Sequence, residues 1–442
     1  MNELDIELPE GYRITDLGPL PEEWEVVRLG EVFNVQQGKQ LSSKESKDGK
    51  IKRPFLRTSN LSWGYVSISK IDEMYFTPQE YEKLRLKSGD VLVCEGGDIG
   101  RTALYRGELD ECAYQNHLHR LRPKRDNIEV EFFVFWMNHA INQRQLYTYT
   151  ANRTTIPNLS GSRLKSFIFP LPPLSEQKKI AAVLSTIQEV KERTEAVISA
   201  TRDLKNSMMK YLFTYGPVPL PEAETVPLKE TEIGMIPEEW EVVNLSEVMD
   251  LRRGVSWRKE EANREGIGTP VIGIPNIKEN GSIDFADTYF LNKNIPEERL
   301  LRTNDIVFVG SSGSIKNIGR NVLIREIPQN TFTYASFTFL GRVRSMKGDS
   351  EYLFYLLNSR VVDFTKYARR ASDGKYNFQL TQFKNEQKIP LPPLSTQQKI
   401  ASMLSAIDEK IEAEENKKKA LDDLFNTLLH DLMTAKIRVN HL

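Results

Sequence analysis

Apolar side chains recur in alternating steps of three and four residues along two long segments, each of which begins just after a Pro-Pro pair. This spacing is the a/d pattern of a helix that packs along a partner helix. Because proline is excluded from a helix interior, Pro172-Pro173 and Gly216-Pro217 bound the first segment, and Pro392-Pro393 precedes the second. We therefore predict two helices of roughly 35–40 residues, each about 55–60 Å long at ~1.5 Å per residue.

The two segments differ in how completely their seam is apolar. The first is apolar or small throughout, whereas the second carries Lys410, Glu414 and Lys417 in its middle, where Ile411 can fill part of the gap. We predict that the two helices pair with each other, because each seam is longer than one domain of ~150 residues could cover. The alternative is that each helix packs only on its own domain. The expected pairing residues are Ile180, Val183, Ile187, Val190, Val197, Leu204, Ile400, Met403, Ile407, Leu421, Leu424 and Leu428.

Serines follow both Pro-Pro pairs. Ser175 and Ser395 stand where a helix N-cap is expected, since a serine hydroxyl can accept a hydrogen bond from an amide of the first turn. Ser395 and Gln398 have capping-box spacing, whereas Ser175 is followed by Lys178 and lacks the reciprocal half.

Shorter apolar runs predict a mixed α/β (α+β) fold for the remaining parts of the chain. Runs of four or five apolar residues bounded by Gly, Asn, Asp or Pro are typical of buried strands. The expected elements are strands at Val91–Cys94, Phe167–Leu171, Ile306–Val309 and Lys388–Leu391, and helices within Phe132–Leu146 and Tyr352–Val362.

The chain also repeats itself. Thr15–Val32 and Thr231–Val248 share 12 of 18 positions, and Pro170–Ile187 and Pro390–Ile407 share 13 of 18. The difference in residue number between matching positions of the two copies is 216 in the first match and 220 in the second, so small insertions and deletions lie between these matching segments. A unit this long is a domain with its own core, not a solenoid repeat. Two similar units predict a pseudo-two-fold protein that suits a target with two halves.

Composition narrows the class of protein. The chain has 442 residues, 39% of them hydrophobic and 27% charged, and only two cysteines. It contains no apolar run of membrane-spanning length, and its acidic N-terminus does not look like a secretory signal. We predict a cytoplasmic protein without a membrane partner.

The charge is uneven along the chain. The net charge of −1 does not favour nucleic-acid binding, yet basic clusters occur at Lys44–Arg57, Arg120–Arg125, Arg252–Lys259 and Arg369–Lys375. A near-neutral protein can still present basic grooves, although each cluster alone can be a solvated loop.

No catalytic motif stands out. Gly310–Asn317 (GSSGSIKN) lacks the lysine of a phosphate-binding loop, and the five histidines suggest no catalytic triad. His117 and His119 could share one face of a strand, but without further ligands at zinc-type spacing they predict no metal site. The pattern indicates a binding protein that is not itself an enzyme.

The duplicated PLPPLS-Q–KIA motif at Pro170 and Pro390, together with the PEEWEVV segment that opens each unit, resembles the specificity subunits of type I restriction-modification enzymes. The resemblance extends from about Thr15 to Leu432. It implies two target-recognition domains (residues 1–170 and 216–390) and a central and a distal long helix (residues 171–215 and 391–442) that form an antiparallel coiled coil.

The resemblance also implies a division of labour. Each recognition domain would read one half of a bipartite double-stranded DNA target, while the helices set the spacer. The partners would be two modification (methyltransferase) subunits and restriction/translocase subunits. This chain would hold no cofactor, because S-adenosylmethionine, ATP and Mg would be bound by those partners.

Polar residues in the loops that differ between the two copies are the candidates for DNA contact, because such side chains contact base edges and phosphates. Asn60 and Asn276 align between the copies and can instead be turn caps of the scaffold. The candidates are Lys39, Ser42, Ser43, Lys44, Arg57, Ser59, Asn60, Arg101, Gln115, Asn116 and Arg153 in the first unit, and Arg253, Ser256, Arg258, Asn276, Ser311, Ser312, Ser314, Lys316, Ser336, Arg370 and Lys375 in the second.

Two alternatives remain open at this point. One is the specificity chain of a type II-like restriction-methyltransferase system, which neighbouring genes would distinguish. The other is a scaffold whose two modules bind proteins or glycans, which the near-neutral charge permits.

Overall fold

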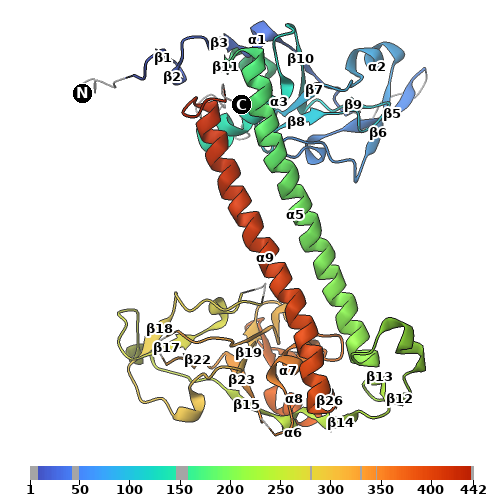
Figure 1. Cartoon of the computed structure of the whole chain (residues 1–442), viewed down its shortest axis with the longest axis vertical. Coiled ribbons are helices and arrows are strands. Elements are labelled where there is room, and N and C mark those ends of the chain that lie inside the picture. The colour runs from blue at the N-terminus through green and yellow to red at the C-terminus, as the bar shows by residue number, and fades with distance from the viewer. Residues whose placement is uncertain are drawn as a thin grey trace. The chain divides into compact units, whose positions relative to one another are not determined.

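The computed structural model describes residues 8–41, 49–145, 158–278, 281–328, 331–344 and 346–439. The chain divides into two compact units. Unit 1 comprises Met1–Glu195 and Asn416–Leu442, and unit 2 comprises Ala196–Glu415. Two long helices, α5 (Leu174–Tyr215) and α9 (Leu394–Met433), each contribute one half to either unit (Figure 1).

Unit 1 is built on an antiparallel four-stranded sheet in the order β4-β10-β7-β8, with a three-stranded sheet β6-β5-β9 beside it. Its strands are β1 (Tyr12–Thr15), β2 (Gly18–Pro21), β3 (Glu25–Arg28), β4 (Phe33–Gln37), β5 (Ile51–Leu56), β6 (Asp72–Phe76), β7 (Asp90–Cys94), β8 (Thr102–Tyr105), β9 (Ala113–Tyr114), β10 (Leu118–Pro123) and β11 (Ile168–Leu171). Its short helices are α1 (Leu29–Val32), α2 (Pro78–Leu84), α3 (Val130–Asn138) and α4 (Gly161–Ser166).

Aromatic packing joins the sheet of unit 1 to its helices. The centre of the Phe133 ring on α3 lies 4.5 Å from the centre of the Phe33 ring and 5.4 Å from that of the Phe169 ring. All three side chains are fully buried. Strand β11 pairs with β3, so the end of the globular part returns to its beginning before α5 starts. The same core includes Ile180 and Leu184 of α5 and Phe425 and Leu429 of α9.

Unit 2 repeats this plan. The sheet order β15-β23-β19-β21 matches β4-β10-β7-β8, and β14 pairs with β26 as β3 pairs with β11. Its strands are β12 (Leu228–Thr231), β13 (Gly234–Pro237), β14 (Glu241–Asn244), β15 (Met249–Arg253), β16 (Ala262–Asn263), β17 (Thr269–Ile272), β18 (Tyr289–Leu291), β19 (Ile306–Val309), β20 (Ser311–Ser312), β21 (Asn321–Leu323), β22 (Thr333–Tyr334), β23 (Thr338–Val343), β24 (Ala368–Arg370), β25 (Tyr376–Phe378) and β26 (Lys388–Leu391). Its short helices are α6 (Leu245–Val248), α7 (Ser350–Leu357) and α8 (Leu380–Glu386).

The mixed fold predicted from the sequence is confirmed, with local corrections. The four predicted strands correspond to β7, β11, β19 and β26. The helix predicted within Phe132–Leu146 is α3 followed by a π-helical turn at His139–Gln143. The helix predicted within Tyr352–Val362 already ends at Leu357, and its C-cap residue Asn358 leaves the helical conformation (φ −93°, ψ 4°) while its side chain donates to Asn321 Oδ1 (2.8 Å).

The long helices begin one residue earlier than the sequence indicates. Both start at a leucine directly after Pro-Pro, so Ser175 and Ser395 lie inside the first turn and the predicted serine caps are wrong. A glutamine fixes each start instead. Buried Gln177 donates to Pro172 O (2.7 Å), and its amide oxygen accepts from Glu129 N (2.9 Å). Gln397 makes the matching contacts with Pro392 O (2.8 Å) and Asp349 N (2.8 Å).

The paired faces of α5 and α9 are rotated by one residue from the predicted seam. Val197, Leu204, Met403 and Leu424 are 36–52% exposed, which corrects their assignment as pairing residues. Ile180 and Ile400 are buried as expected, and Val183, Ile187, Val190, Ile407, Leu421 and Leu428 are half-buried. The inward rows are instead Leu184, Lys191, Ile198, Lys205 and Leu212 on α5 and Leu404, Ile411, Lys418, Phe425 and Leu432 on α9.

Lysines occupy this inner face because acidic partners satisfy them. In unit 1, Lys191 Nζ lies 2.6 Å from Asp422 Oδ1 and 4.6 Å from the centre of the Phe425 ring. In unit 2, Lys205 Nζ lies 2.6 Å from Asp408 Oδ1. Their aliphatic stems cover apolar surface while the charged ends pair. As residue numbers rise on α5 they fall on α9, so the two segments run antiparallel within each unit.

Candidate nucleic-acid interface

The same set of backbone hydrogen bonds occurs in both units at the end of the main sheet. These bonds join the residues after β4 or β15 to the turn before β10 or β23, and they form the turn frame, whose exposed turn residues are its tip. In unit 1, Gly38 N donates to Leu118 O (3.1 Å) and Lys39 N to Tyr114 O (3.1 Å). In unit 2, Gly254 N donates to Thr338 O (3.1 Å) and Val255 N to Tyr334 O (2.8 Å). A Cβ atom at Gly38 or Gly254 would lie 2.4 Å or 2.0 Å from a carbonyl oxygen of the facing turn, so only glycine allows this close approach.

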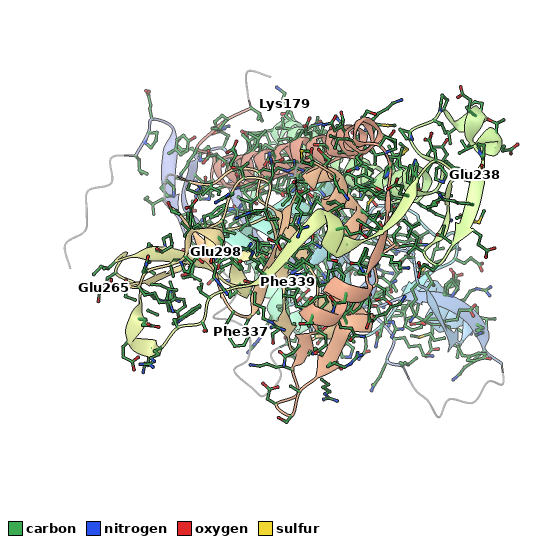
Figure 2. All side chains as sticks on the ribbon, turned by 90° about the horizontal axis from the view of Figure 1, so that it is seen from below. Lys179, Glu238, Glu265, Glu298, Phe337 and Phe339 are labelled. Carbon is green, nitrogen blue, oxygen red and sulfur yellow. The ribbon has the colours of Figure 1, made fainter. Side chains whose placement is uncertain are left out.

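The tips of this frame carry different side chains. The β9–β10 turn presents Gln115, Asn116 and the exposed His117. The β22–β23 turn buries Ala335 (5% exposed) and presents Ser336 and Phe337, which is 62% exposed, whereas Phe339 two residues later is 2% exposed (both phenylalanines are labelled in Figure 2). The repeat has therefore kept the backbone geometry and changed the surface chemistry.

In unit 1, polar groups converge beside the tip. The Gln37 amide donates to Glu95 Oε2 (2.6 Å) and to Asn116 O (3.0 Å), and Asn116 N donates to Lys39 O (2.8 Å). The Lys39 ammonium is turned inward: it lies 2.9 Å from Glu80 Oε2 and its side chain is 9% exposed. Lys39 is thus placed near the tip, but it supports the frame with its charge already paired.

A second polar group of unit 1 surrounds the 3-10 turn Thr58–Asn60. Arg101 donates to Thr58 O (2.8 Å) and pairs with Asp98, Arg57 pairs with Asp72, and Ser59 is exposed. Asn60 is corrected here as a DNA-contact candidate. It is 4% exposed, its side-chain oxygen accepts a hydrogen bond from Arg57 N, and its side-chain nitrogen donates to Ser67 O and Lys70 O.

Asn276 has the same role in unit 2. It is 4% exposed, accepts from Gly273 N (2.8 Å) and donates to Asp284 O (2.8 Å) and Asp287 O (3.0 Å). Both asparagines are scaffold caps, because a buried amide with satisfied bonds cannot reach a base edge.

Unit 2 adds a three-stranded sheet, β20-β25-β24, next to its tip. Gly310 joins the two features, since its amide donates to Phe337 O (2.8 Å) and its carbonyl accepts from Phe378 N (2.9 Å). Across this sheet Ser312 and Arg370 both pair with Tyr376, so these three residues form one row. Arg370 is exposed and makes no ion pair with any described residue.

Other predicted residues lie around this sheet. Ser311 is buried at 6% exposure and pairs with Asn377, while Lys375 is exposed in the β24–β25 turn. Arg253 donates to Phe378 O (3.0 Å). Tyr376 and Asn377 also lie in this sheet and were not predicted from the sequence, because a two-residue strand such as β20 has no periodic pattern from which their position could be inferred.

The remaining candidates are spread around unit 2 or fall where the structure gives no description. Ser256, Arg258, Ser314 and Lys316 are exposed, and Val255 pairs with Ala335, which brings Ser256 near Ser336. Ser42, Ser43, Lys44 and Arg153 lie outside the described residues.

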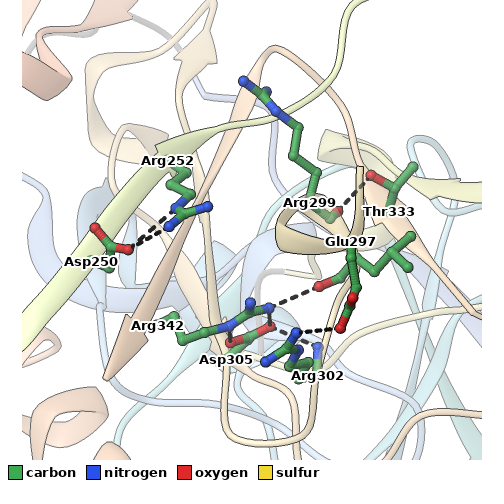
Figure 3. A network of polar contacts seen from close by, with 9 residues as sticks. Asp250, Arg252, Glu297, Arg299, Arg302, Asp305, Thr333 and Arg342 are labelled. Carbon is green, nitrogen blue, oxygen red and sulfur yellow. Dashed lines mark hydrogen bonds and ion pairs between the residues drawn. The ribbon is translucent and has the colours of Figure 1, made fainter. Parts of the chain in front are cut away.

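Matched ion pairs hold the sheet behind both tips. Arg122 contacts Asp90 in unit 1 (2.5 and 2.8 Å), and Arg342 contacts Asp305 in unit 2 (2.8 and 2.7 Å; Figure 3). Each aspartate is 2% exposed or less, and its hydrogen bonds raise the pKa of the partner guanidinium. Burial also raises the pKa of Tyr334 to about 12, so this tyrosine stays protonated at neutral pH.

The described residues show no metal-binding cluster of three or more His, Cys, Asp or Glu side chains. His119 is buried and bonded to Leu159 O (2.9 Å), whereas His117 is exposed, so the two imidazoles do not share an environment. Among the described helices, none is both long and apolar enough to span a bilayer.

Comparison with known proteins identifies the family. The type I restriction modification DNA specificity domain matches the chain twice, over residues 21–200 and over residues 237–423. The chain belongs to this family.

A relative named as a specificity subunit matches nearly the full length of the chain, and another matches less than half of it. The MjaX type I restriction enzyme specificity subunit of Methanocaldococcus jannaschii is 30% identical over 441 residues, with 97% of each chain covered. The EcoKI specificity subunit of Escherichia coli K12 is 28% identical over 190 residues, which cover 41% of this chain and 38% of that one. This protein is accordingly a specificity subunit, a non-catalytic DNA-recognition chain, and the type II-like alternative is not favoured.

Solved structures share the fold of this specificity subunit. The S subunit of a type I restriction-modification system from M. genitalium superposes with a TM-score of 0.59 at 17% identity, covering 92% of this chain and 96% of that one. A chain from a type I restriction-modification assembly gives a TM-score of 0.56 at 19% identity, covering 95% and 99%.

Proposed function

We propose that each unit reads one half of a bipartite double-stranded DNA target. The observation that carries the proposal is the turn frame at Gly38 and Gly254, whose backbone bonds are repeated while its tip residues differ. A common frame places both tips at equivalent depth on equivalent sheets. Different tips then select different base sequences, because base edges in the major groove offer distinct donors and acceptors.

The chemistry of the two tips fits two half-sites. Gln115 and Asn116 carry amides, which pair bidentately with adenine. Unit 2 offers Ser336, Arg370 and Lys375, of which arginine is suited to guanine and lysine to phosphate. The net charge of −1 means that such local groups, and not the charge of the whole chain, attract the duplex.

A second matched feature supports docking of two identical partners. In unit 1, Glu131 accepts from Arg106 (2.6 Å) and from Ser185 of α5 (3.3 Å). In unit 2, Glu351 pairs with Arg325 and accepts from Ser405 of α9 (3.3 Å). Both triads line pockets between a long helix and the sheet. In this proposal one modification subunit docks at each, and S-adenosylmethionine, ATP and magnesium are bound by the modification and restriction subunits.

In the same proposal α5 and α9 act as a ruler for the spacer. Each helix is continuous over 40 residues or more, and a continuous helix has a fixed rise per residue. The number of helical residues would then set the separation of the half-sites.

Arg370→Ala tests the recognition role of unit 2. In the complex assembled with its modification subunits, we expect binding to weaken by about 1–3 kcal/mol and selectivity to relax in the unit 2 half-site only. Competition binding with duplexes altered in one half-site at a time measures both effects at fixed salt.

Arg193→Ala is the matched control for Arg370→Ala. Arg193 is an exposed arginine on α5 whose ion-pair partner among the described residues is Glu189, one turn away, so its loss removes the same charge from a helix surface that belongs to neither tip. Equal relaxation of both half-sites by Arg370→Ala, or none, would contradict the role assigned to this arginine.

A further inference from the structure

The C-terminal tail of unit 1, residues 434–439, closes a site around Trp24. The Trp24 indole N–H donates to Glu176 Oε2 (2.9 Å) at the start of α5. Arg438 donates to Glu176 Oε1 (2.6 Å) and Oε2 (2.9 Å) and to Glu23 Oε1 (2.7 Å), and its guanidinium lies 5.9 Å from the centre of the Trp24 ring. Glu176 is 4% exposed, and hydrogen bonding to its carboxylate raises the pKa of Arg438.

Unit 2 keeps the tryptophan and the glutamate beside it but lacks the buried glutamate and the arginine. The repeat places Trp240 at the position of Trp24 and Glu239 at that of Glu23, but Thr396 replaces Glu176 and Val218 replaces Arg438. The Trp240 side chain is 1% exposed, and its indole N–H has no hydrogen-bond partner among the described residues. The indole nitrogen of Trp240 is not itself fully buried, so this N–H faces the adjoining pocket, where water or a ligand can accept a hydrogen bond from it.

A pocket lies where the arginine would be. It is lined by Trp240, Val218, Thr396 and Lys399, and also by Glu222, Glu238 (labelled in Figure 2) and Glu239, whose carboxylates form no ion pair with any described residue. The first turn of α9 also borders it; Thr396 N and Gln397 N already donate to Pro393 O (2.9 and 3.0 Å), and the positive end of the helix dipole favours a carboxylate there. The vacant half of the site thus suits two charges at once: a cation beside the glutamates and an anion beside the indole and the helix.

We infer that this pocket receives an arginine and a neighbouring carboxylate from the modification subunit docked on unit 2. The inference rests on the proposed function for the identity of the partner. Arginine fits better than lysine, because a planar guanidinium can stack on an indole and bind a carboxylate through two nitrogens, as Arg438 does in unit 1. Since unit 1 fills its own site, the two modification subunits would be held unequally.

Filling the pocket from within tests the inference. Val218→Arg with Thr396→Glu restores in unit 2 the residues that unit 1 has. Titration of the full chain with the modification subunit of the same restriction system, followed by calorimetry and native mass spectrometry, should show two strong sites in the parent. In the double variant we expect one of them to weaken at least 10-fold, with thermal stability unchanged or raised.

Glu239→Gln provides a second test that does not depend on the packing of new side chains. It should weaken the same single site several-fold, whereas Glu224→Gln, an exposed neighbour outside the pocket, should weaken neither. N-acetylarginine, which carries a guanidinium and a carboxylate, should compete at that site better than N-acetyllysine.

Affinities at both sites that stay equal to those of the parent chain, in the double variant and in Glu239→Gln alike, would overturn the inference. The DNA methylation motif, measured in parallel, separates this result from failure of the proposed function. A variant that loses one docking site but keeps both half-sites in the motif supports the pocket. A parent chain that recognises no bipartite motif refutes the proposed function whatever the pocket does.

Discussion

Removing Ala196–Arg202 together with Ile411–Lys417 shortens the spacer between the two half-sites by about 3 base pairs. Each deletion removes seven residues, or about 10.5 Å of helix at ~1.5 Å per residue, and DNA rises ~3.4 Å per base pair. Seven residues are close to two helical turns, so the inward rows stay aligned on either side of the cuts. The deletions face each other, as the Arg202–Glu415 ion pair (2.5 Å) indicates.

Methylation mapping in cells that carry the assembled system measures this spacer directly. Both half-site sequences should be unchanged while their separation falls. The control deletes five residues from each helix, Ala196–Ala200 and Ala413–Lys417, which turns the inward rows by about 140° because each residue advances ~100°. That variant should lose assembly instead of gaining a shorter spacer. An unchanged spacer in the seven-residue variant would falsify the ruler role of α5 and α9.

Asp305→Ala destabilises unit 2 by about 3 kcal/mol. Asp305 is 1% exposed and accepts from Arg342 (2.8 and 2.7 Å) and from Arg302 N (2.7 Å). Its removal leaves the Arg302 amide without its acceptor and the Arg342 guanidinium without its ion-pair partner, although Arg342 still donates to Leu300 O (2.8 Å). Loss of one partner of a fully buried pair costs about 3–5 kcal/mol, and the lower value applies because the Arg342 side chain is 23% exposed and keeps some contact with water.

Hydrogen exchange of the β19 and β23 amides, combined with denaturant unfolding, detects this loss within unit 2. The matched control is Asp287→Ala, which breaks an exposed pair with Arg264 and should cost less than about 1 kcal/mol. Unit 1, whose Asp90–Arg122 pair is intact, is the internal reference. Equal destabilisation by the two aspartate variants would show that burial of Asp305 does not determine its contribution.

The sequence located the long helices because a seam repeated over 40 residues is a strong signal, but it placed their inward faces one residue away. Hydrophobicity favours Val197 and Leu204 over Lys191 and Lys205, and only the acidic residues opposite make the lysines the better choice. Those partners lie more than 200 positions away in the chain. Periodicity within one helix cannot reveal them.

The candidate interface was predictable from the sequence only in outline. Comparing the two copies indicates that divergent loops carry the specificity, and their alignment already identified Asn60 and Asn276 as possible caps. The comparison cannot show that Gly310 joins the Phe337 turn to the β20-β25-β24 sheet, because these contacts connect segments far apart in sequence. The predicted domain boundaries and the base-contact roles of individual residues stay predictions.

The most direct test of two-unit recognition exchanges residues 33–160 for the corresponding segment of a specificity subunit with a different target. Methylation mapping of cells that carry the complete system then reports the recognised motif. Recognition by two separate units predicts a bipartite motif in which one half changes to that of the donor while the other half and the spacer stay the same. A change in both halves, or in neither, would contradict it.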